Sequence, residues 1–250
     1  MTKVAIITGS SGGIGLALVK TFLADGYFVL GLDINPSKSI MSEAYVEIEV
    51  NLLTFSKDTL YRDSVLANIK ELLPHMVNKF VLINNAAEQI LKLVAEIKWQ
   101  DWENSLAVNT VAPFFLVQGL TDELSASSGH VINISSIHAK LTKTKFTCYS
   151  ASKSALEAIT RSLALELSPI GVSVNAIAPA AISTEMLKAS FKDKPEKLLE
   201  LKRYHPAGYI GTPEQIALFV KSITEQKGGF LTGSILEFNG GIAGQLHDPN

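Results

Sequence analysis

The chain has 250 residues, of which 47% are hydrophobic and 18% are charged, so it is long enough to bury a large core. Its formal net charge of -2 and the even scatter of Lys and Arg exclude the basic surface typical of proteins that bind nucleic acids or membrane surfaces. The apolar runs all fall short of the roughly 18 residues that a membrane-spanning helix needs.

Short apolar runs alternate with longer segments of helical periodicity along most of the chain. This alternation is typical of β-α-β units around a parallel sheet, and the near-continuous apolar runs indicate strands buried on both faces. We expect strands at residues 3–8, 27–33, 45–52, 79–85, 130–135, 172–178 and 234–239. Helices are expected at residues 14–25, 55–73, 99–126, 149–168 and 212–225.

The pattern predicts an α/β fold with a Rossmann-like, doubly wound sheet of seven mainly parallel strands and helices on both faces. No linker, repeat or low-complexity tract divides the sequence, so we expect residues 1–250 to form one domain. Residues 183–211 depart from the alternation, because they are polar, helical in pattern and interrupted by Pro195 and Pro206. We expect this segment to lie outside the sheet as a substrate lid. The alternative is a surface excursion with no part in binding.

Three glycines, Gly9, Gly13 and Gly15, link the first expected strand to the first expected helix. Glycine allows positive φ and close approach to a ligand, and the free N–H groups of a helix N-terminus suit a pyrophosphate. Asp33 ends the second strand, where a carboxylate can bind both hydroxyls of an adenosine ribose and repel a 2′-phosphate. The only cation near this turn is Lys38. The pattern predicts a dinucleotide site that prefers NAD to NADP.

Tyr149 and Lys153 are four positions apart at the start of an expected helix, so both side chains point to one side. A free phenol has a pKa of about 10, and a nearby ammonium or the positive charge of an oxidised nicotinamide favours its ionised form. The pair predicts a proton-transfer group. The alternative is two unrelated residues at a helix start.

Several motifs follow one another at the separations of a known family. They are the G-x-x-x-G-x-G spacing of "TGSSGGIG" (8–15), "NNAA" (84–87), Asn109, "ISS" (134–136), "YSASK" (149–153), "PAAIST" (179–184), "GYIGTPEQIA" (208–217) and "LTGSILEFNGG" (231–241). With these motifs in order, the chain resembles the short-chain dehydrogenase/reductase family over almost its whole length.

The resemblance implies a group of four catalytic residues. Tyr149 would exchange a proton with the substrate, Lys153 would also bind the nicotinamide ribose, and Asn109 would hold a water beside the lysine. Ser136 would orient the substrate oxygen, since it lies 13 residues before Tyr149 as in the family. The competing Ser135 points to the opposite face of the strand.

The resemblance also implies the cofactor contacts. These would be Gly9, Ser11, Gly13, Ile14, Gly15, Asp33, Asn51, Leu52, Asn85, Ala86, Tyr149, Lys153, Pro179, Ile182 and Thr184. Position 51 carries Asn where many relatives carry an Asp that contacts the adenine. Position 180 carries Ala in place of the commoner Gly.

The segment 135–149 joins the serine strand to the tyrosine helix and should line the substrate pocket. His138 and Phe146 are candidate contacts there, and His205 is a candidate on the expected lid. The segment also carries Lys140, Lys143 and Lys145, which would suit a small polar or anionic substrate such as a sugar or hydroxy acid. The alternative is that these lysines only keep a loop soluble.

The favoured function is an NAD-dependent oxidoreductase acting on a secondary alcohol or the matching ketone. One alternative is an NADPH-dependent 3-oxoacyl-thioester reductase, and another is a non-catalytic protein that senses NAD(H). The resemblance implies a homotetramer or homodimer with helices 99–126 and 149–168 in a two-fold interface.

The expected location is the cytoplasm. Cys148, the only cysteine, excludes an internal disulfide and fits a reducing compartment. The start "MTKVAIITGS" also lacks the longer apolar region of a secretory signal. We expect no metal site, because the histidines lack the paired spacing of zinc ligands.

Overall fold

Seven strands form one parallel sheet in the order β3-β2-β1-β4-β5-β6-β7. The computed structural model describes residues 2–37, 39–226 and 228–245. The strands are β1 (Thr2–Thr8), β2 (Tyr27–Asp33), β3 (Tyr45–Glu49), β4 (Val77–Asn84), β5 (His130–Ile134), β6 (Ser173–Pro179) and β7 (Ile235–Phe238). The predicted fold class is confirmed. Lys38, the cation considered for the cofactor preference, lies outside the described residues.

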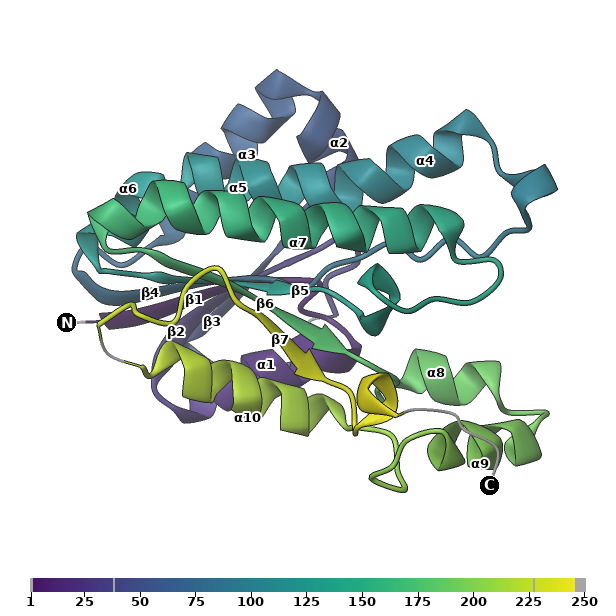
Figure 1. Cartoon of the computed structure of the whole chain (residues 1–250). Helices are drawn as coiled ribbons and strands as arrows, with labels where there is room; N and C mark the ends of the chain where they lie inside the picture. The colour runs from purple at the N-terminus through teal and green to yellow at the C-terminus, as the bar shows by residue number, and fades with distance from the viewer. Residues whose placement is uncertain (1, 38, 227, 246–250) are drawn as a thin grey trace.

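Helices cover both faces of the sheet, as Figure 1 shows. One face carries α1 (Gly13–Ala24) and α10 (Pro213–Thr224), and the other carries α3 (Thr59–Leu72), α5 (Ala112–Gly119), α6 (Thr121–Ala126) and α7 (Thr147–Leu167). Each face has its own apolar core. The α1 face is filled by residues such as Phe22, Ile7 and Val220, and the α7 face by residues such as Phe55, Phe80 and Leu116. Burial of these side chains is the main stabilising contribution.

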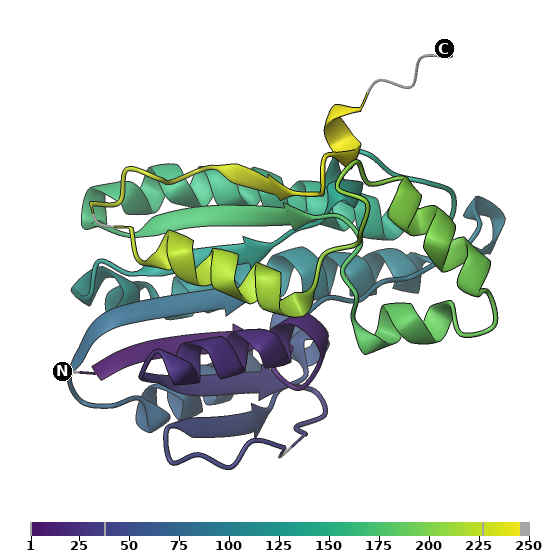
Figure 2. The same ribbon diagram turned by 90° about the horizontal axis from the view of Figure 1, so that it is seen from below.

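The direction of strand addition reverses between β1 and β4. In open α/β sheets, ligands bind outside the carboxyl ends of the strands at such a reversal. Helices α8 (Glu185–Ser190) and α9 (Pro195–Arg203) lie beyond these carboxyl ends, outside the sheet (Figures 1 and 2). A short parallel bridge between Ile182 and Gly211 closes the base of this segment.

Two long predicted helices are broken in the structure. Residues 55–73 were expected to form one helix, but α2 (Leu52–Lys57) ends before Asp58, whose carboxylate caps the start of α3 by accepting from Tyr61 N. Strand β3 is also shorter than expected. It ends at Glu49 because Asn51 accepts hydrogen bonds from Leu53 N and Thr54 N and so starts α2.

The predicted helix 99–126 is divided into α4 (Trp99–Leu106), a π-helical turn (Ala107–Val111), α5 and α6. In this turn Ala112 N donates to the carbonyl of Ala107, one residue further back than in an α-helix. Pro113 follows directly and has no N–H. The main-chain carbonyl of Asn109, four residues before Pro113, therefore cannot receive the usual helical hydrogen bond.

Candidate active site

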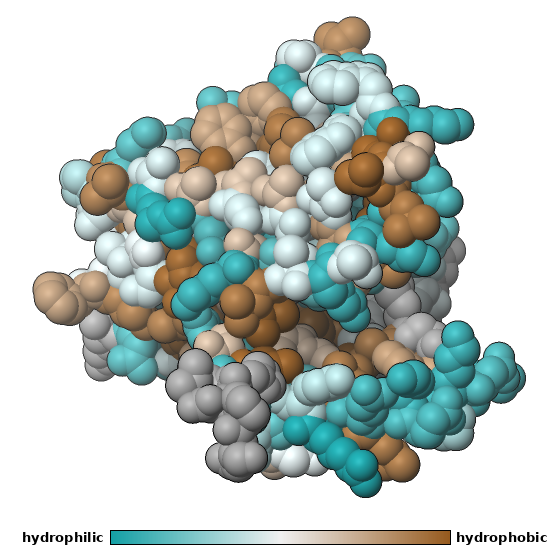
Figure 3. All heavy atoms as spheres, turned by 45° about the vertical axis from the view of Figure 1, so that its right-hand side comes forward, coloured by the Kyte–Doolittle hydropathy of each residue, from teal (hydrophilic) through white to brown (hydrophobic). Residues whose placement is uncertain are grey.

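The four predicted catalytic residues lie on three elements beside the carboxyl end of β5. Ser136 lies two residues beyond the end of this strand and caps a short 3-10 turn, Tyr149 and Lys153 occupy the first turns of α7, and Asn109 lies in the π-helical turn. All four are buried, with at most 9% of any side chain exposed. Figure 3 shows a hollow between the segment that holds α8 and α9 and the rest of the molecule, with hydrophobic residues on its walls.

Lys153 is hydrogen-bonded to the end of strand β5. Its Nζ donates a hydrogen bond to the main-chain oxygen of Ile134 at 2.7 Å and lies 5.8 Å from the centre of the Tyr149 ring. Burial lowers the pKa of Lys153 to about 7. The ammonium therefore lies close to its own titration at neutral pH.

The hydroxyl of Ser136 lies close enough to that of Tyr149 to influence its pKa. Burial raises the pKa of Tyr149, and the Ser136 hydroxyl opposes part of that rise. The sequence argument assigned the control of this acidity to Lys153. Desolvation is the larger effect here, so the phenol is protonated at neutral pH and has a proton to donate.

The side chain of Asn109 is fully engaged. Its Oδ1 accepts from Glu88 N at 2.8 Å, and its Nδ2 donates to Glu88 O and to Ser152 Oγ, each at 2.9 Å. The side chain thus joins the loop after β4 to the helix that carries Tyr149 and Lys153. The main-chain carbonyl of Asn109 lacks the usual α-helical donor four residues further on, because Pro113 has no N–H.

The glycine turn has the shape of a phosphate cradle. Gly9 and Gly13 have φ of +66° and +51°, and a Cβ at Gly15 would collide with the carbonyl oxygen of Gly9. Gly12 is exposed, faces open space and caps α1 without a side-chain hydrogen bond. The first N–H groups of α1 therefore remain available for an anion such as pyrophosphate, and these residues fit the group.

Three side chains fix the glycine turn: Asn85 after β4, Thr8 at the end of β1 and Asp33 at the end of β2. Asn85 Nδ2 donates to the main-chain oxygens of Thr8 and Gly9 at 2.9 and 3.1 Å. Thr8 Oγ1 accepts from Asn85 N and Ala86 N. Asp33 Oδ2 accepts from Ser11 N at 3.0 Å, which places its carboxylate beside the turn. Asn85 was predicted as a direct cofactor contact, and the structure shows that its amide supports the turn.

Other predicted cofactor residues lie at the starts of helices α1 and α2. Ile14 and Gly15 form the first turn of α1, and Leu52 is buried at the start of α2 beside Asn51. The Asn51 Oδ1 that was expected near the adenine serves instead as the cap of α2. An Asn before a helical pattern is a capping signal, and it predicts this role.

The loop after β6 approaches the glycine turn from the other side. Pro179 ends β6, Ile182 is buried, and Thr184 caps α8 by accepting from Leu187 N at 3.2 Å. A Cβ built at Gly13 would meet the methyl group of Thr184 at 3.1 Å. Between these parts lies a pocket of about 290 Å³, whose lining includes Gly13, Thr184 and Lys188.

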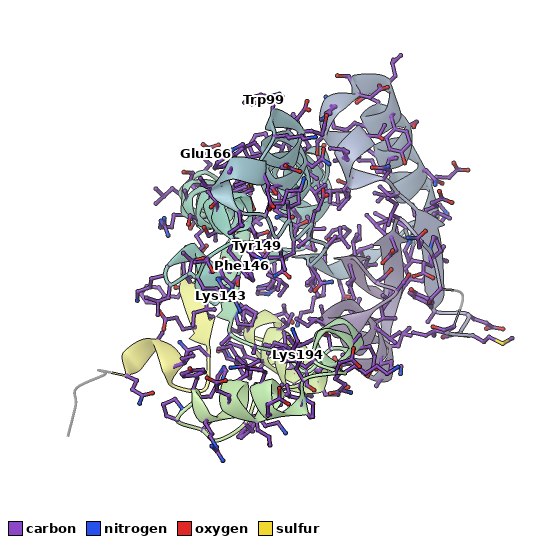
Figure 4. The ribbon with its side chains drawn as sticks, turned by 90° about the vertical axis from the view of Figure 1, so that its right-hand side faces the viewer. Trp99, Lys143, Phe146, Tyr149, Glu166 and Lys194 are labelled. Carbon is purple, nitrogen blue, oxygen red and sulfur yellow. The ribbon has the colours of Figure 1, made fainter. Side chains whose placement is uncertain are left out.

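Of the three predicted substrate contacts, His138 and Phe146 lie beside Tyr149 and His205 does not. His138 stacks on Phe146 with ring centres 4.1 Å apart, and both rings lie about 6 Å from that of Tyr149, at 6.0 and 6.1 Å. Figure 4 shows Phe146 next to Tyr149, with Lys143 on the same side. The Nζ of Lys143 lies 5.0 Å from the centre of the Phe146 ring. Burial lowers the pKa of His138 to about 4, so its imidazole is neutral at pH 7.

His205 lies elsewhere. It is buried, its Nδ1 donates to Leu201 O at 2.9 Å, and it lines a separate pocket of about 270 Å³ near Gly240. Among the described residues that line this pocket, none is one of the four predicted catalytic residues. His205 is placed here because it follows α9 and packs against the turn after β7. Nothing in the sequence pattern separates these two pockets.

Two further residues that the sequence analysis named, Lys140 and Cys148, make contacts within the fold. Lys140 forms an ion pair with Glu237 at 3.0 Å. Cys148 is buried, and burial raises the pKa of its thiol. Within the described ranges there is no group of three His, Cys, Asp or Glu residues that could hold a metal ion.

The comparisons with known proteins agree on the class of protein. Residues 3–195 match the family profile described as short chain dehydrogenase. An uncharacterized oxidoreductase from Thermotoga maritima is 33% identical over 96% of this chain and 95% of its own length. A 3-oxoacyl-[acyl-carrier-protein] reductase from Aquifex aeolicus is 30% identical over 96% and 97%. An NAD-dependent glycerol dehydrogenase from Listeria innocua is 28% identical over 96% and 93%.

Solved structures are similar along the whole chain. Aldohexose dehydrogenase from Thermoplasma acidophilum has a TM-score of 0.87 at 25% identity and covers 100% of this chain and 98% of its own. A 4-hydroxyisoleucine dehydrogenase in complex with NADH and the protein ElxO with NADP bound each have a TM-score of 0.86 at 25% identity. Both cover 98% of this chain and 100% of their own.

The doubly wound sheet, the phosphate cradle and the buried tyrosine beside it define a nicotinamide-dependent oxidoreductase. The chain belongs to the short-chain dehydrogenase family and acts on CH–OH groups.

Proposed function

We propose that the protein transfers a hydride between NAD(H) and a secondary alcohol or the matching ketone. The observation that carries this proposal is the closeness of the buried Ser136 and Tyr149 hydroxyls beyond the carboxyl end of β5, with Lys153 fixed by Ile134 O and 5.8 Å from the Tyr149 ring centre. A hydroxyl pair of this kind can hold a substrate oxygen and exchange a proton with it.

The cofactor supplies or accepts the hydride, and the side chains manage the oxygen and its proton. In reduction, Tyr149 gives its phenolic proton to the carbonyl oxygen while Ser136 donates a hydrogen bond to that oxygen. In oxidation, Tyr149 takes the alcohol proton. Lys153 stabilises the resulting phenolate, and the Asn109 carbonyl holds a water that continues the proton path from Lys153.

NAD is the proposed cofactor. Support comes from Asp33, whose carboxylate stands beside the glycine turn where a 2′-phosphate would meet a like charge. One relative is named an NAD-dependent dehydrogenase and one structural neighbour holds NADH, while another holds NADP. We assign the adenosine side to Asp33, Asn85 and Ala86, and the nicotinamide side to Pro179, Ile182 and Thr184.

The proposed substrate is small and polar, with a sugar-like or hydroxy-acid character. His138 and Phe146 stack beside Tyr149 and would bound the substrate on one side. Lys143 is exposed near this stack and could attract a carboxylate. Relatives named for glycerol and aldohexose oxidation support a polyol. Helices α8 and α9 would act as the lid over it.

We also propose a homodimer or homotetramer that forms through α4 and α7. Trp99 on α4 and Leu165 on α7 are large hydrophobic residues with 78% and 80% of their surface exposed. Burial of such side chains in a two-fold interface would remove them from water. Within the described part of the chain, no helix is long and apolar enough to span a membrane. A cytoplasmic location remains part of the proposal.

A 3-oxoacyl-thioester reductase is the second candidate function, because the Aquifex aeolicus relative at 30% identity carries that name. A protein that senses NAD(H) without chemistry is a third. One experiment separates the three. NADH and NADPH binding are measured by fluorescence titration, and turnover is measured with polyols, hydroxy acids and a 3-oxoacyl thioester.

The proposal expects tighter NADH binding and turnover of a polyol or hydroxy acid. Tyr149→Phe should still bind NADH, although it loses one expected cofactor contact, and should lose turnover, whereas Tyr27→Phe, at the far end of the sheet, should retain both. Preference for NADPH with turnover of the thioester alone would favour the second candidate. NADH binding without turnover on the whole panel would favour the sensor.

A further inference from the structure

Glu47 lies in the middle of β3, and its side chain reaches the glycine turn across β2. Its Oε1 accepts hydrogen bonds from Ser10 Oγ at 2.9 Å and from Ser11 Oγ at 2.7 Å. In the strand register Glu47 stands beside Gly31 of β2. A Cβ at Gly31 would lie only 2.6 Å from Ser10 Oγ and 2.7 Å from the hydroxyl of Tyr45. The glycine therefore leaves the space in which the turn and β3 can meet.

The hydroxyl of Ser11 has no proton to offer a ligand. A serine hydroxyl carries one donor and two acceptor sites, and Ser11 directs its proton to Glu47. The same oxygen accepts the N–H of Ser37 at 3.1 Å. The main-chain N–H of Ser11 is also committed, because it donates to Asp33 Oδ2. Ser11 thus connects two carboxylates and gives both of its donors to them.

These two carboxylates make the proposed ribose site beside the glycine turn rich in hydrogen-bond acceptors. Asp33 Oδ1 accepts from Asn35 N at 2.9 Å, and its Oδ2 accepts from Ser11 N, yet each oxygen retains a further lone pair. A ribose hydroxyl, which can donate, finds an acceptor here. A 2′-phosphate carries about two negative charges, accepts hydrogen bonds only, and would meet the like charge of Asp33 and a serine without a free donor.

We propose that Glu47 is a second specificity-determining residue, which together with Asp33 keeps a 2′-phosphorylated adenosine out of this site. Glu47 acts by holding the Ser11 hydroxyl, which it withdraws as a donor. The inference rests on the proposed function, because it takes the adenosine ribose to lie beside Asp33.

The test compares Glu47→Gln with the parent chain in fluorescence titrations with NADH and NADPH, without substrate. Glutamine keeps the length and an acceptor oxygen but removes the charge. We expect the dissociation constant for NADPH to fall at least about tenfold and that for NADH to change less than about threefold.

The matched control is Glu49→Gln. Glu49 is exposed two residues further along β3, stands beside Asp33 in the register and carries the same charge. We expect this variant to change the ratio of NADPH to NADH affinity by less than about threefold, because the contact with the serines is specific to Glu47. An equal gain in both variants would overturn the proposal in favour of a general charge effect.

Ser11→Ala tests the donor argument independently of whether Glu47→Gln folds. In the parent background it should leave NADPH affinity within about threefold, because the hydroxyl is already committed to Glu47. In the Glu47→Gln background it should remove most of the gain, since a neutral amide holds the Ser11 hydroxyl more weakly than a carboxylate does and the hydroxyl can then turn to donate to the phosphate. Weaker NADPH binding in Ser11→Ala alone would show that the hydroxyl is free in the parent and would overturn the proposal.

The outcomes also separate this inference from the proposed function. A parent chain that binds both cofactors equally contradicts the proposed NAD preference and this inference together. A parent chain that prefers NADH, with an unchanged ratio in Glu47→Gln, contradicts the role of Glu47 alone.

Discussion

The ammonium of Lys153 is bound to the main-chain oxygen of Ile134, the last residue of the strand that leads to Ser136. This bond connects helix α7, which carries Tyr149, to strand β5, which leads to Ser136. The distance of 2.7 Å and the near-complete burial of Lys153 mean that the charge is held in place at a cost in solvation. Function and stability therefore make opposite demands on this residue.

Lys153→Met should separate those demands. Methionine has a similar length and no charge to desolvate, so we expect the free energy of unfolding to stay within about 1 kcal/mol of the parent value or to rise. Turnover should fall by about a hundredfold or more, because the phenolate of Tyr149 loses its nearest cation. Urea unfolding and steady-state kinetics measure the two effects. Parallel losses of stability and activity would contradict this account.

Ser136→Ala should change the pH dependence of the reaction. The hydroxyl of Ser136 lowers the pKa of Tyr149, so its removal should move the apparent pKa for alcohol oxidation upward. We also expect kcat to fall by a factor of about ten to a thousand, because the substrate oxygen loses one donor. The measurement is a pH profile of kcat for parent and variant.

Ser135→Ala is the matched control for Ser136→Ala. The hydroxyl of Ser135 donates to Glu157 at 2.8 Å, which directs it away from Tyr149. Its removal should leave the pH profile unchanged and lower the unfolding free energy by about 1 kcal/mol. A shift in the Ser135 variant equal to that in the Ser136 variant would contradict the assignment of the substrate-orienting serine.

The residues that the sequence placed well are those whose role depends on neighbours in the chain. Tyr149 and Lys153 face one side because a helix has 3.6 residues per turn, and Gly9 and Gly13 have positive φ because the strand must turn sharply into α1. Local rules are sufficient for such positions, and the parallel sheet followed from the apolar runs in the same way.

The features that sequence analysis missed depend on contacts between distant parts of the chain. The π-helical turn Ala107–Val111 lies between helical segments with no break in the helical pattern, so periodicity alone did not reveal it, although Pro113 was a visible sign of irregularity. Glu47 was not singled out because its partners, Ser10 and Ser11, are 37 and 36 residues away. His205 was grouped with the substrate contacts because the sequence does not show how residues 183–211 pack against Gly240. This packing places His205 in a separate pocket.

Gly15→Ala should destabilise the protein and weaken cofactor binding. A methyl group there would collide with the carbonyl of Gly9, which is rigid backbone, so α1 must move away from β1. We expect a loss of about 1–3 kcal/mol in unfolding free energy, as for other overpacked sites, and a weaker affinity for NADH. Gly12→Ala is the control, because position 12 faces open space and its φ of -147° is accessible to alanine. Similar losses in both variants would argue against steric closeness as the cause.

His130 should make the protein less stable as the pH falls. It is buried at the start of β5, where its Nδ1 is bonded to Ser173 Oγ at 2.7 Å, and burial lowers its pKa from 6.5 to about 4. In this pH window the unfolded chain binds more protons than the folded chain. The stabilisation by neutral His130 is therefore complete above pH 6.5, declines as the pH falls from 6.5 toward 4, and amounts to at most about 3 kcal/mol.

His130→Gln tests this, because glutamine keeps a polar group for Ser173 but does not titrate. Urea unfolding at pH 7 and pH 5 should show a smaller difference in free energy between the two pH values for this variant than for the parent chain. The pKa of His138 is also lowered by burial, so part of the acid sensitivity should remain. His75→Gln, at an exposed position, should leave the difference unchanged. An undiminished pH dependence in His130→Gln would mean that other groups cause the acid sensitivity, since the imidazole of His130 would then titrate alike in the folded and unfolded chains.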